Sequence, residues 1–195
     1  MTTATLPILE AAVLVMAAPL CGVFLATRRF RGALPAAALF GVALMASAGW
    51  TVGTSGWSPA IVRTAFVSHA TLAVVGLALA AFGGWLGAVF VDPLDAAAVG
   101  VGAALVAALG LVAAGPLGAD LPTRVVNAAL VASPIVSAAS AADVDLLRTD
   151  LLYRVSPLAH GRFDYPPWYS AVAVYGTLLL ISLAGTARAL RKGWL

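Results

Sequence analysis

The sequence contains very little cysteine and very little charge. Its single cysteine, Cys21, excludes an intrachain disulfide framework and a cysteine-based metal site within one chain. Charged residues make up only 10% of the 195 residues, whereas soluble domains carry roughly a quarter. Apolar residues make up 62%, and a water-soluble fold of this size could not bury so much apolar surface. The composition therefore predicts a protein whose main solvent is the lipid bilayer.

The sequence also lacks the short motifs of common hydrolases and transferases. It contains no GxSxG, no HExxH and no glycine-rich phosphate loop. The net charge of +3 comes mostly from two basic clusters at the ends of apolar segments. Such clusters indicate membrane orientation rather than a nucleic-acid surface. We therefore expect neither catalysis by this chain alone nor a nucleic-acid partner.

Long apolar segments occupy most of the chain, which predicts an all-α, polytopic membrane bundle forming one integral membrane domain over residues 1–195. A helix needs about 20 mainly apolar residues to span a bilayer. Five segments approach or exceed this length, at residues 6–26, 34–52, 61–91, 96–114 and 170–187. The N-terminus lacks the basic region of a signal peptide, so we expect the first span to be retained.

Small residues recur at helical spacing in the third and fourth predicted spans. Such faces let two helix backbones approach closely. We expect these two spans to form a tight antiparallel hairpin across the short VDPLD turn. The predicted packing residues are Gly76, Gly83, Gly87, Gly100 and Ala104.

Residues 125–142 form an apolar segment that is short for a span and contains Pro134. Proline removes a backbone hydrogen bond, and non-helical backbone at membrane depth persists only where protein or water shields it. We therefore favour a broken or re-entrant segment here. The alternative is a full span, which would give six spans in total. Asn127 within this segment is a candidate functional polar residue.

A second helix is predicted directly after this segment. The stretch from Ser140 to Asp143 matches a capping box, which marks a helix start. Apolar residues then recur at helical spacing from Val144 to Val155. We expect an amphipathic helix on the membrane surface before the last span. Residues 115–165 would then form an extracytoplasmic loop containing the broken segment and the surface helix.

Five spans place both basic clusters on one side of the membrane. The positive-inside rule assigns that side to the cytoplasm. We therefore expect the N-terminus outside the cell (inner) membrane and the C-terminus in the cytoplasm. The clusters consist of Arg28, Arg29 and Arg31 and of Arg188, Arg191 and Lys192.

Two histidines are the candidate cofactor ligands. His69 lies two turns into the third span, and in the five-span topology it is on the same side as His160. No cofactor is expected, and the alternative is a b-type haem or a metal held by these two histidines. Another alternative is that His69 hydrogen-bonds a neighbouring helix. A proton or quinone site built on His69, Glu10 and Asp164 also stays open, because ionisable groups inside a membrane are often functional.

The stretch VNAALVASPIVSAASAADVDLLRTDLLYRVSPLAHGRFDYPPWY, under a quarter of the chain, resembles in its order of elements the membrane component of ABC-2-type exporters. Those permeases also carry a broken segment and a short outer helix before their last span. This chain lacks their amphipathic N-terminal helix and has one span fewer. The resemblance implies a non-catalytic permease subunit that works with other membrane subunits or an ATPase. The alternative is the membrane anchor of an electron-transfer complex, with a redox partner and a haem or quinone near His69.

Overall fold

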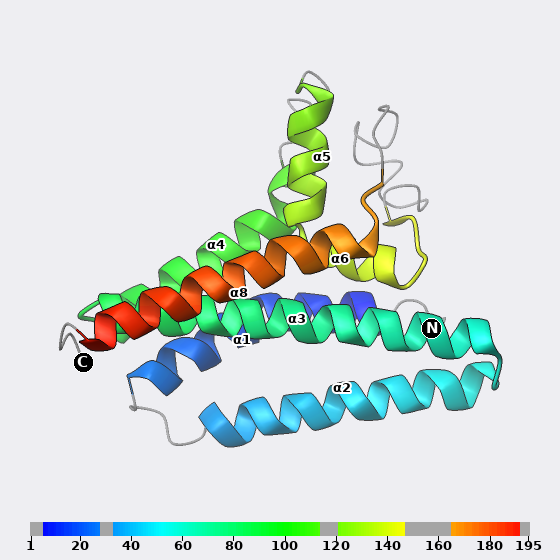
Figure 1. Ribbon diagram of the computed structural model, residues 1–195, viewed down its shortest axis with the longest axis horizontal. Helices are drawn as coiled ribbons and strands as arrows, with labels where there is room; N and C mark the ends of the chain where they lie inside the picture. Colours follow the sequence, from blue (N-terminus) through cyan, green and yellow to red (C-terminus); the bar gives the residue numbers. More distant parts are fainter. Residues whose placement is uncertain (1–5, 28–32, 114–120, 147–164, 192–195) are drawn as a thin grey trace.

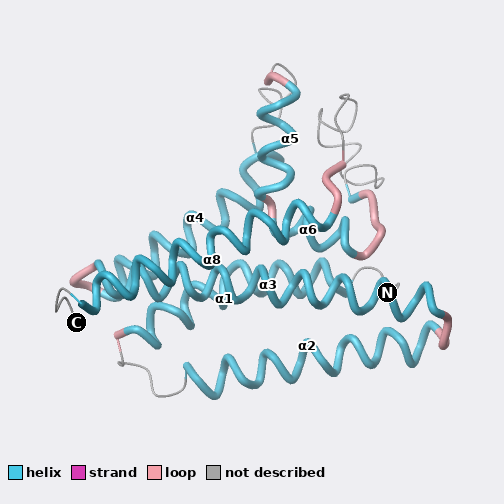
Figure 2. The backbone as a smooth tube through the Cα atoms, in the orientation of Figure 1, coloured by secondary structure: helices cyan, strands magenta, loops and turns pink. Residues whose placement is uncertain are grey.

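The computed structural model describes residues 6–27, 33–113, 121–146 and 165–191. Within these ranges the regular structure is entirely helical and contains no strand (Figure 2). The all-α prediction is therefore confirmed for this part of the chain. The helices are α1 (Leu6–Ala26), α2 (Ala33–Ser55), α3 (Pro59–Val89), α4 (Pro93–Ala113), α5 (Thr123–Ala132), α6 (Pro134–Ala141) and α8 (Trp168–Arg191).

Among the described residues, four helices are long and apolar enough to cross a membrane: α1, α3, α4 and α8. The bent pair α5–α6 gives a fifth candidate if it is counted as one span. α2 is 23 residues long, so its length also suits a bilayer. These long helices lie where hydropathy predicted spans.

The long helices run roughly along one axis, with α3 in the centre (Figure 1). α3 makes its most extensive contacts with α1 and then with α8, and α2 packs along one side against α1 and α3. α1 begins at one end of the bundle and α8 ends at the other (Figure 1).

Glycines allow α1 and α3 to approach closely. A Cβ atom on Gly83 would collide with the backbone of Pro19, and one on Gly22 would collide with the carbonyl oxygen of Ala80. A Cβ on Gly87 would lie 2.9 Å from the carbonyl oxygen of Val23. Lipid tails are as apolar as the helix side chains, so the hydrophobic effect does not drive helices together inside a bilayer. Close backbone packing of this kind would therefore provide much of the stability of the bundle.

We predicted the wrong partner for the face of α3 that carries its small residues. We expected it to pack on α4, but Gly83 and Gly87 face α1, and a Cβ on Gly76 would lie 2.9 Å from the Leu14 side chain of α1. The small residues of α4 do lie at interfaces. A Cβ on Gly100 would be 3.3 Å from both Leu86 and Pro19, and Ala104 is buried.

Large apolar side chains lie exposed on the outside of the bundle. They include Met45, Phe66, Val106 and Leu180, each about 70% exposed or more. Soluble monomers rarely expose apolar surface on this scale. The interior is instead rich in alanine, for example Ala11, Ala78, Ala104 and Ala138. This distribution agrees with a bundle whose outer surface contacts lipid.

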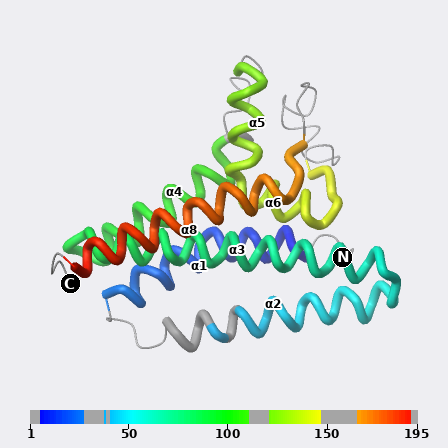
Figure 3. Tube along the Cα trace, viewed as in Figure 1, coloured from blue at the N-terminus to red at the C-terminus, as the bar shows by residue number. Residues whose placement is uncertain are grey.

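The helical conformation is interrupted between α5 and α6, and the helix axis bends there by 80°. α6 lies against α1 and α3, whereas α5 turns away from the long helices (Figure 3). The N-cap of α6 is Ser133, whose hydroxyl accepts from the amide of Val136, and Pro134 is the first helical residue. Proline suits that position because no helical partner exists for its missing N–H. The predicted break at Pro134 is therefore confirmed.

The predicted capping box was wrong. Ser140 lies inside α6, and Asp143 follows the end of that helix with a positive φ of 62°. The amide of Val144 bonds to the carbonyl of Ala139, and that of Asp143 bonds to the carbonyl of Ser140. This pair of bonds is a Schellman motif, which ends a helix. The predicted surface helix falls mostly on residues 147–164, outside the described residues.

Candidate functional site

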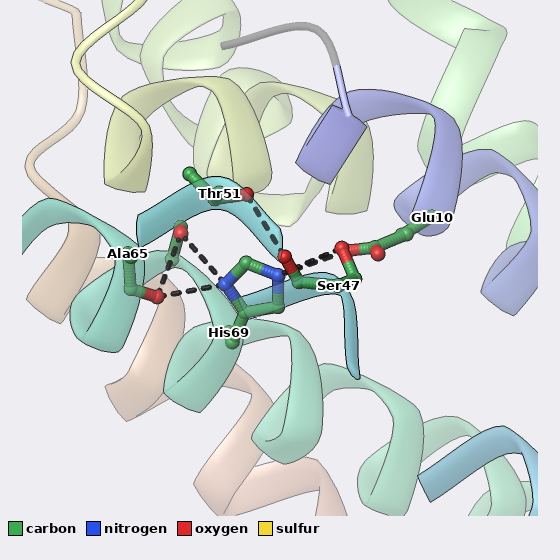
Figure 4. Close-up of polar contacts among 6 residues, drawn as sticks. Glu10, Ser47, Thr51, Ala65 and His69 are labelled. Carbon is green, nitrogen blue, oxygen red and sulfur yellow. Dashed lines mark hydrogen bonds and ion pairs between the residues drawn. The ribbon is translucent and has the colours of Figure 1, made fainter. Parts of the chain in front are cut away.

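Glu10 of α1 and His69 of α3 form a pair enclosed between three helices (Figure 4). The Nε2 atom of His69 lies 3.4 Å from Oε2 of Glu10 and 3.2 Å from the hydroxyl oxygen of Ser47 on α2. The side chains of His69 and Glu10 are only 9% and 17% exposed. The structure thus brings together two predicted candidates and adds Ser47.

The register of α1 against α3 places the pair at one level. The two helices run parallel, with Leu14 opposite Gly76 and Pro19 opposite Gly83. Glu10 lies one turn before Leu14, so its side chain reaches the level of His69. The glycine contacts that hold the helices together therefore also position the two ionisable groups.

The Nδ1 atom of His69 has a defined role. It lies 2.7 Å from the carbonyl oxygen of Ala65, one turn earlier on α3. A carbonyl oxygen only accepts hydrogen bonds, so Nδ1 carries a hydrogen and donates it. In a neutral ring Nε2 is then an acceptor, and it is Nε2 that faces Ser47 and Glu10.

This arrangement favours a hydrogen-bonding role for His69 over ligation of iron, because both of its ring nitrogens have protein partners. His160 and Asp164 lie outside the described residues, so a site that either one shares with His69 stays a prediction. In the described ranges, no three histidine, cysteine or acidic side chains gather where they could hold a metal ion.

Two cavities lie near the pair, lined by residues next to it but by neither Glu10 nor His69. A cavity of about 370 Å³, here called the hydroxyl-lined cavity, has Thr51, Ser55, Thr64 and Ser68 in its wall. A second, of about 360 Å³ and here called the apolar cavity, extends in the opposite direction along the helices. Its walls include Leu14, Leu44, Leu72, Gly76 and Cys21.

The break between α5 and α6 is the second polar feature of the bundle. Pro134 has no N–H, and the bend leaves the last carbonyls of α5 without their usual helical partners. Three side-chain or backbone donors replace those partners. They are the Ser133 amide to Leu130 O (3.2 Å), the Ser137 hydroxyl to Val131 O (3.4 Å) and the Tyr175 hydroxyl to Ala132 O (2.6 Å).

Asn127 lies on α5 and is not part of the Glu10–His69 cluster. Its Oδ1 atom is buried and has no hydrogen-bond partner among the described residues. The structure therefore gives Asn127 an unused acceptor, which is consistent with its prediction as a functional polar residue but assigns it no role.

Sequence reasoning missed Ser47, Tyr175 and Gly22. Ser47 and Thr51 are polar residues four apart in an apolar segment, a spacing that puts both on one helix face. Gly22 lies four residues from both Ala18 and Ala26, a small-residue pattern like the one recognised in α3. Tyr175 gave no signal, because its partner Ala132 is distant in the sequence.

No protein-family model, no curated protein and no solved structure matches this chain.

Proposed function

We propose that this chain is a non-catalytic, multi-pass subunit of a membrane transporter, of permease type. The observation that carries the proposal is the broken pair α5–α6, whose freed carbonyls at Leu130, Val131 and Ala132 all have donors. Irregular backbone persists at membrane depth only when its polar groups are paired inside the protein. Broken helices of this kind form substrate sites in many transporters.

The proposed topology has five spans, α1, α2, α3, α4 and α8, with α5–α6 as a re-entrant segment. The end of α1 lies at the same end of the bundle as the last turn of α8, which holds Arg188 and Arg191 (Figure 1). Arg63, near the start of α3, belongs to the opposite end. This distribution supports a cytoplasmic C-terminus and an outer N-terminus in the inner membrane.

An energy-supplying partner is part of the proposal. On the proposed cytoplasmic side, only residues 27–32 join α1 to α2, and only residues 90–92 join α3 to α4. Connections this short cannot hold a nucleotide-binding domain. We therefore propose a cytoplasmic ATPase subunit as the partner.

Cysteine labelling separates the five-span from the six-span topology. In a Cys21→Ser background, Leu121→Cys precedes α5 and Val144→Cys follows α6. We expect an impermeant thiol reagent to label both from outside intact cells, together with Trp57→Cys in the α2–α3 turn. Asp92→Cys in the α3–α4 turn should label only after the membrane is opened. Labelling of 121 and 144 from opposite sides would make α5–α6 a full span.

Purification from native membranes in a mild detergent tests the transporter assignment. We expect a nucleotide-binding subunit in constant ratio to this chain and ATP hydrolysis by the complex. A complex that lacks ATPase activity and shows the Soret band of a b-type haem would instead support the electron-transfer anchor. A chain that purifies alone, with neither partner, would contradict both.

A further inference from the structure

We propose that Glu10 and His69 together hold one exchangeable proton, and that protons reach it from one end of the bundle only, where α2 joins α3. The inference rests on the proposed membrane insertion but not on the identity of any transported substrate. It concerns a proton-binding site inside the bundle, in addition to the broken segment α5–α6.

The hydrogen bonds of His69 determine how many protons it shares with Glu10. The Nδ1 hydrogen of His69 is committed to the Ala65 carbonyl, 2.7 Å away. Between Nε2 and the Glu10 carboxyl group there are then two favourable arrangements. Either a protonated Glu10 donates to Nε2, or a doubly protonated His69 donates to the Glu10 carboxylate. Both contain the same additional proton.

Removing that proton would leave an unfavourable arrangement. The Oε2 atom of Glu10 is buried and has no hydrogen-bond partner among the described residues, and Nε2 of His69, a possible donor when the ring is doubly protonated, lies 3.4 Å away. Without the shared proton, the buried Oε2 atom of the carboxylate would face the lone pair of Nε2, and a buried charged oxygen without a donor is costly. The Ser47 hydroxyl can donate one hydrogen to Nε2 but leaves Oε2 without a donor. The unpaired Oε2 atom is thus the geometric ground for a shared proton at this pair.

The described neighbouring elements offer no other charge to stabilise that carboxylate. α6 has no ionisable side chain, and α2 contributes the hydroxyls of Ser47 and Thr51. On α3, Arg63 lines a different cavity with Asp143. The acidic residue of α4 lies in its first turn, and the basic residues of α8 lie in its last turn: Asp95, Arg188 and Arg191.

The two cavities explain why access is one-sided. The hydroxyl-lined cavity includes Thr51 and Ser55 near the end of α2 and Ser68 beside His69. Most of this wall is apolar, but its four hydroxyl groups can hydrogen-bond water, which carries protons. The walls of the apolar cavity contain no hydroxyl, amide or charged side chain, and apolar cavities stay dry. The hydroxyl-lined cavity reaches Ala65 and Ser68, which both contact Nδ1 of His69, so the proposed proton path runs between the pair and the α2–α3 end.

In the proposed topology the α2–α3 end faces outside, so the pair would take up protons from the extracytoplasmic side. The pair connects α1 to α2 and α3. Loss of the proton would replace an attraction between α1 and the other two helices by a repulsion. The proton occupancy of this site would thus control how closely α1 packs on α2 at this level.

Infrared difference spectroscopy of proteoliposomes with uniform orientation tests the proposal. Changing the pH on the α2–α3 side should change a carboxyl or carboxylate band that Glu10→Gln removes and the matched variant Asp95→Asn keeps. Changing the pH on the other side should leave that band unaltered. A Glu10 band that follows the pH of both sides equally, or no band sensitive to Glu10→Gln while the protein stays folded, would overturn the proposal.

Nitrogen NMR of His69 provides a measurement that does not depend on a Glu10 variant folding. In a His160→Asn background only His69 contributes imidazole signals. We expect a protonated Nδ1 and an Nε2 signal typical of a strong hydrogen bond or of a doubly protonated ring. A neutral ring protonated at Nε2 alone would contradict the assignment. Cysteine labelling reports the topology separately, so failure of the proton site and failure of the membrane topology are distinguishable.

Discussion

The hydroxyl group of Tyr175 donates a 2.6 Å hydrogen bond to the carbonyl oxygen of Ala132, 43 positions earlier in the chain. Ala132 is the last residue of α5, immediately before the break. Tyr175 is buried in the second turn of α8. One side chain of the final helix therefore satisfies the backbone that the break exposes.

Replacing that tyrosine tests how much the bond contributes. We expect Tyr175→Phe to lower the free energy of unfolding by about 0.5–1.5 kcal/mol, because the partly buried Ala132 carbonyl loses its donor. Tyr169→Phe is the matched control, since Tyr169 is 62% exposed. Thermal unfolding in detergent measures both variants. Equal stability of the two would show that another donor can replace the Tyr175 hydroxyl.

Glycine substitutions test the α1–α3 interface. Gly83→Ala places a methyl group against the Pro19 backbone, which cannot yield as a flexible side chain would. We expect a loss of at least about 1–3 kcal/mol, as for overpacked cores. Gly102→Ala on α4 is the control, because a Cβ there meets nothing within 4 Å. The fraction of protein remaining monodisperse after heating separates the variants, and unchanged behaviour of Gly83→Ala would disprove the close contact.

Substitutions of Asp143 test the backbone conformation at the end of α6. Asp143 has a φ of 62°, which glycine and asparagine adopt readily and β-branched residues avoid. Asp143→Gly should preserve stability, whereas Asp143→Val should cost about 1–2 kcal/mol. Chemical denaturation in detergent measures the difference. If valine is tolerated as well as glycine, the Schellman motif does not hold this helix end.

Ionisation of the Tyr165 phenol should lower the stability of the protein at alkaline pH. The pKa of this phenol is raised to about 12, mainly by burial, with a smaller increase from the negative charge of Asp145 and an opposing decrease from the hydrogen bond of the Leu146 amide. An unfolded tyrosine has a pKa of about 10. Its contribution to stability is therefore complete below about pH 10 and is lost as the pH rises towards about 12. Tyr165→Phe should reduce the dependence of stability on pH in that window, and an unchanged dependence would contradict the shift.

The positions of the long helices could be predicted because they depend on local sequence. An apolar segment that ends before Arg28 predicted a helix at residues 6–26, and α1 has those bounds. Pro134 likewise predicted the break, because proline acts on its own backbone. The end of α6 was misread, since a serine followed three residues later by an aspartate also fits the end of a helix. Aspartate tolerates a positive φ, so residue types alone do not distinguish these two structures.

The candidate site could be predicted only in part. Glu10 and His69 were recognisable because each is an ionisable residue in an apolar segment. Their contact depends on the parallel register of α1 and α3, which glycine spacing alone does not specify. Small residues show which face of α3 packs closely, but not that its partner is α1. Ser47 could not be recognised as part of the site from the sequence, because its contact with His69 depends on where α2 packs.

The bond between Tyr175 and Ala132 has a consequence for the order of assembly during synthesis. Chains are made from the N-terminus, so α5 and α6 leave the ribosome before the helix that supplies the donor. The hydroxyl of Ser140 likewise donates to the carbonyl of Pro166, which also comes later. We therefore expect the α5–α6 segment to reach its final structure only after α8 has inserted into the membrane. In a chain truncated before Trp168, a cysteine placed at Ser133 should react with thiol reagents, and in the full-length protein it should become protected.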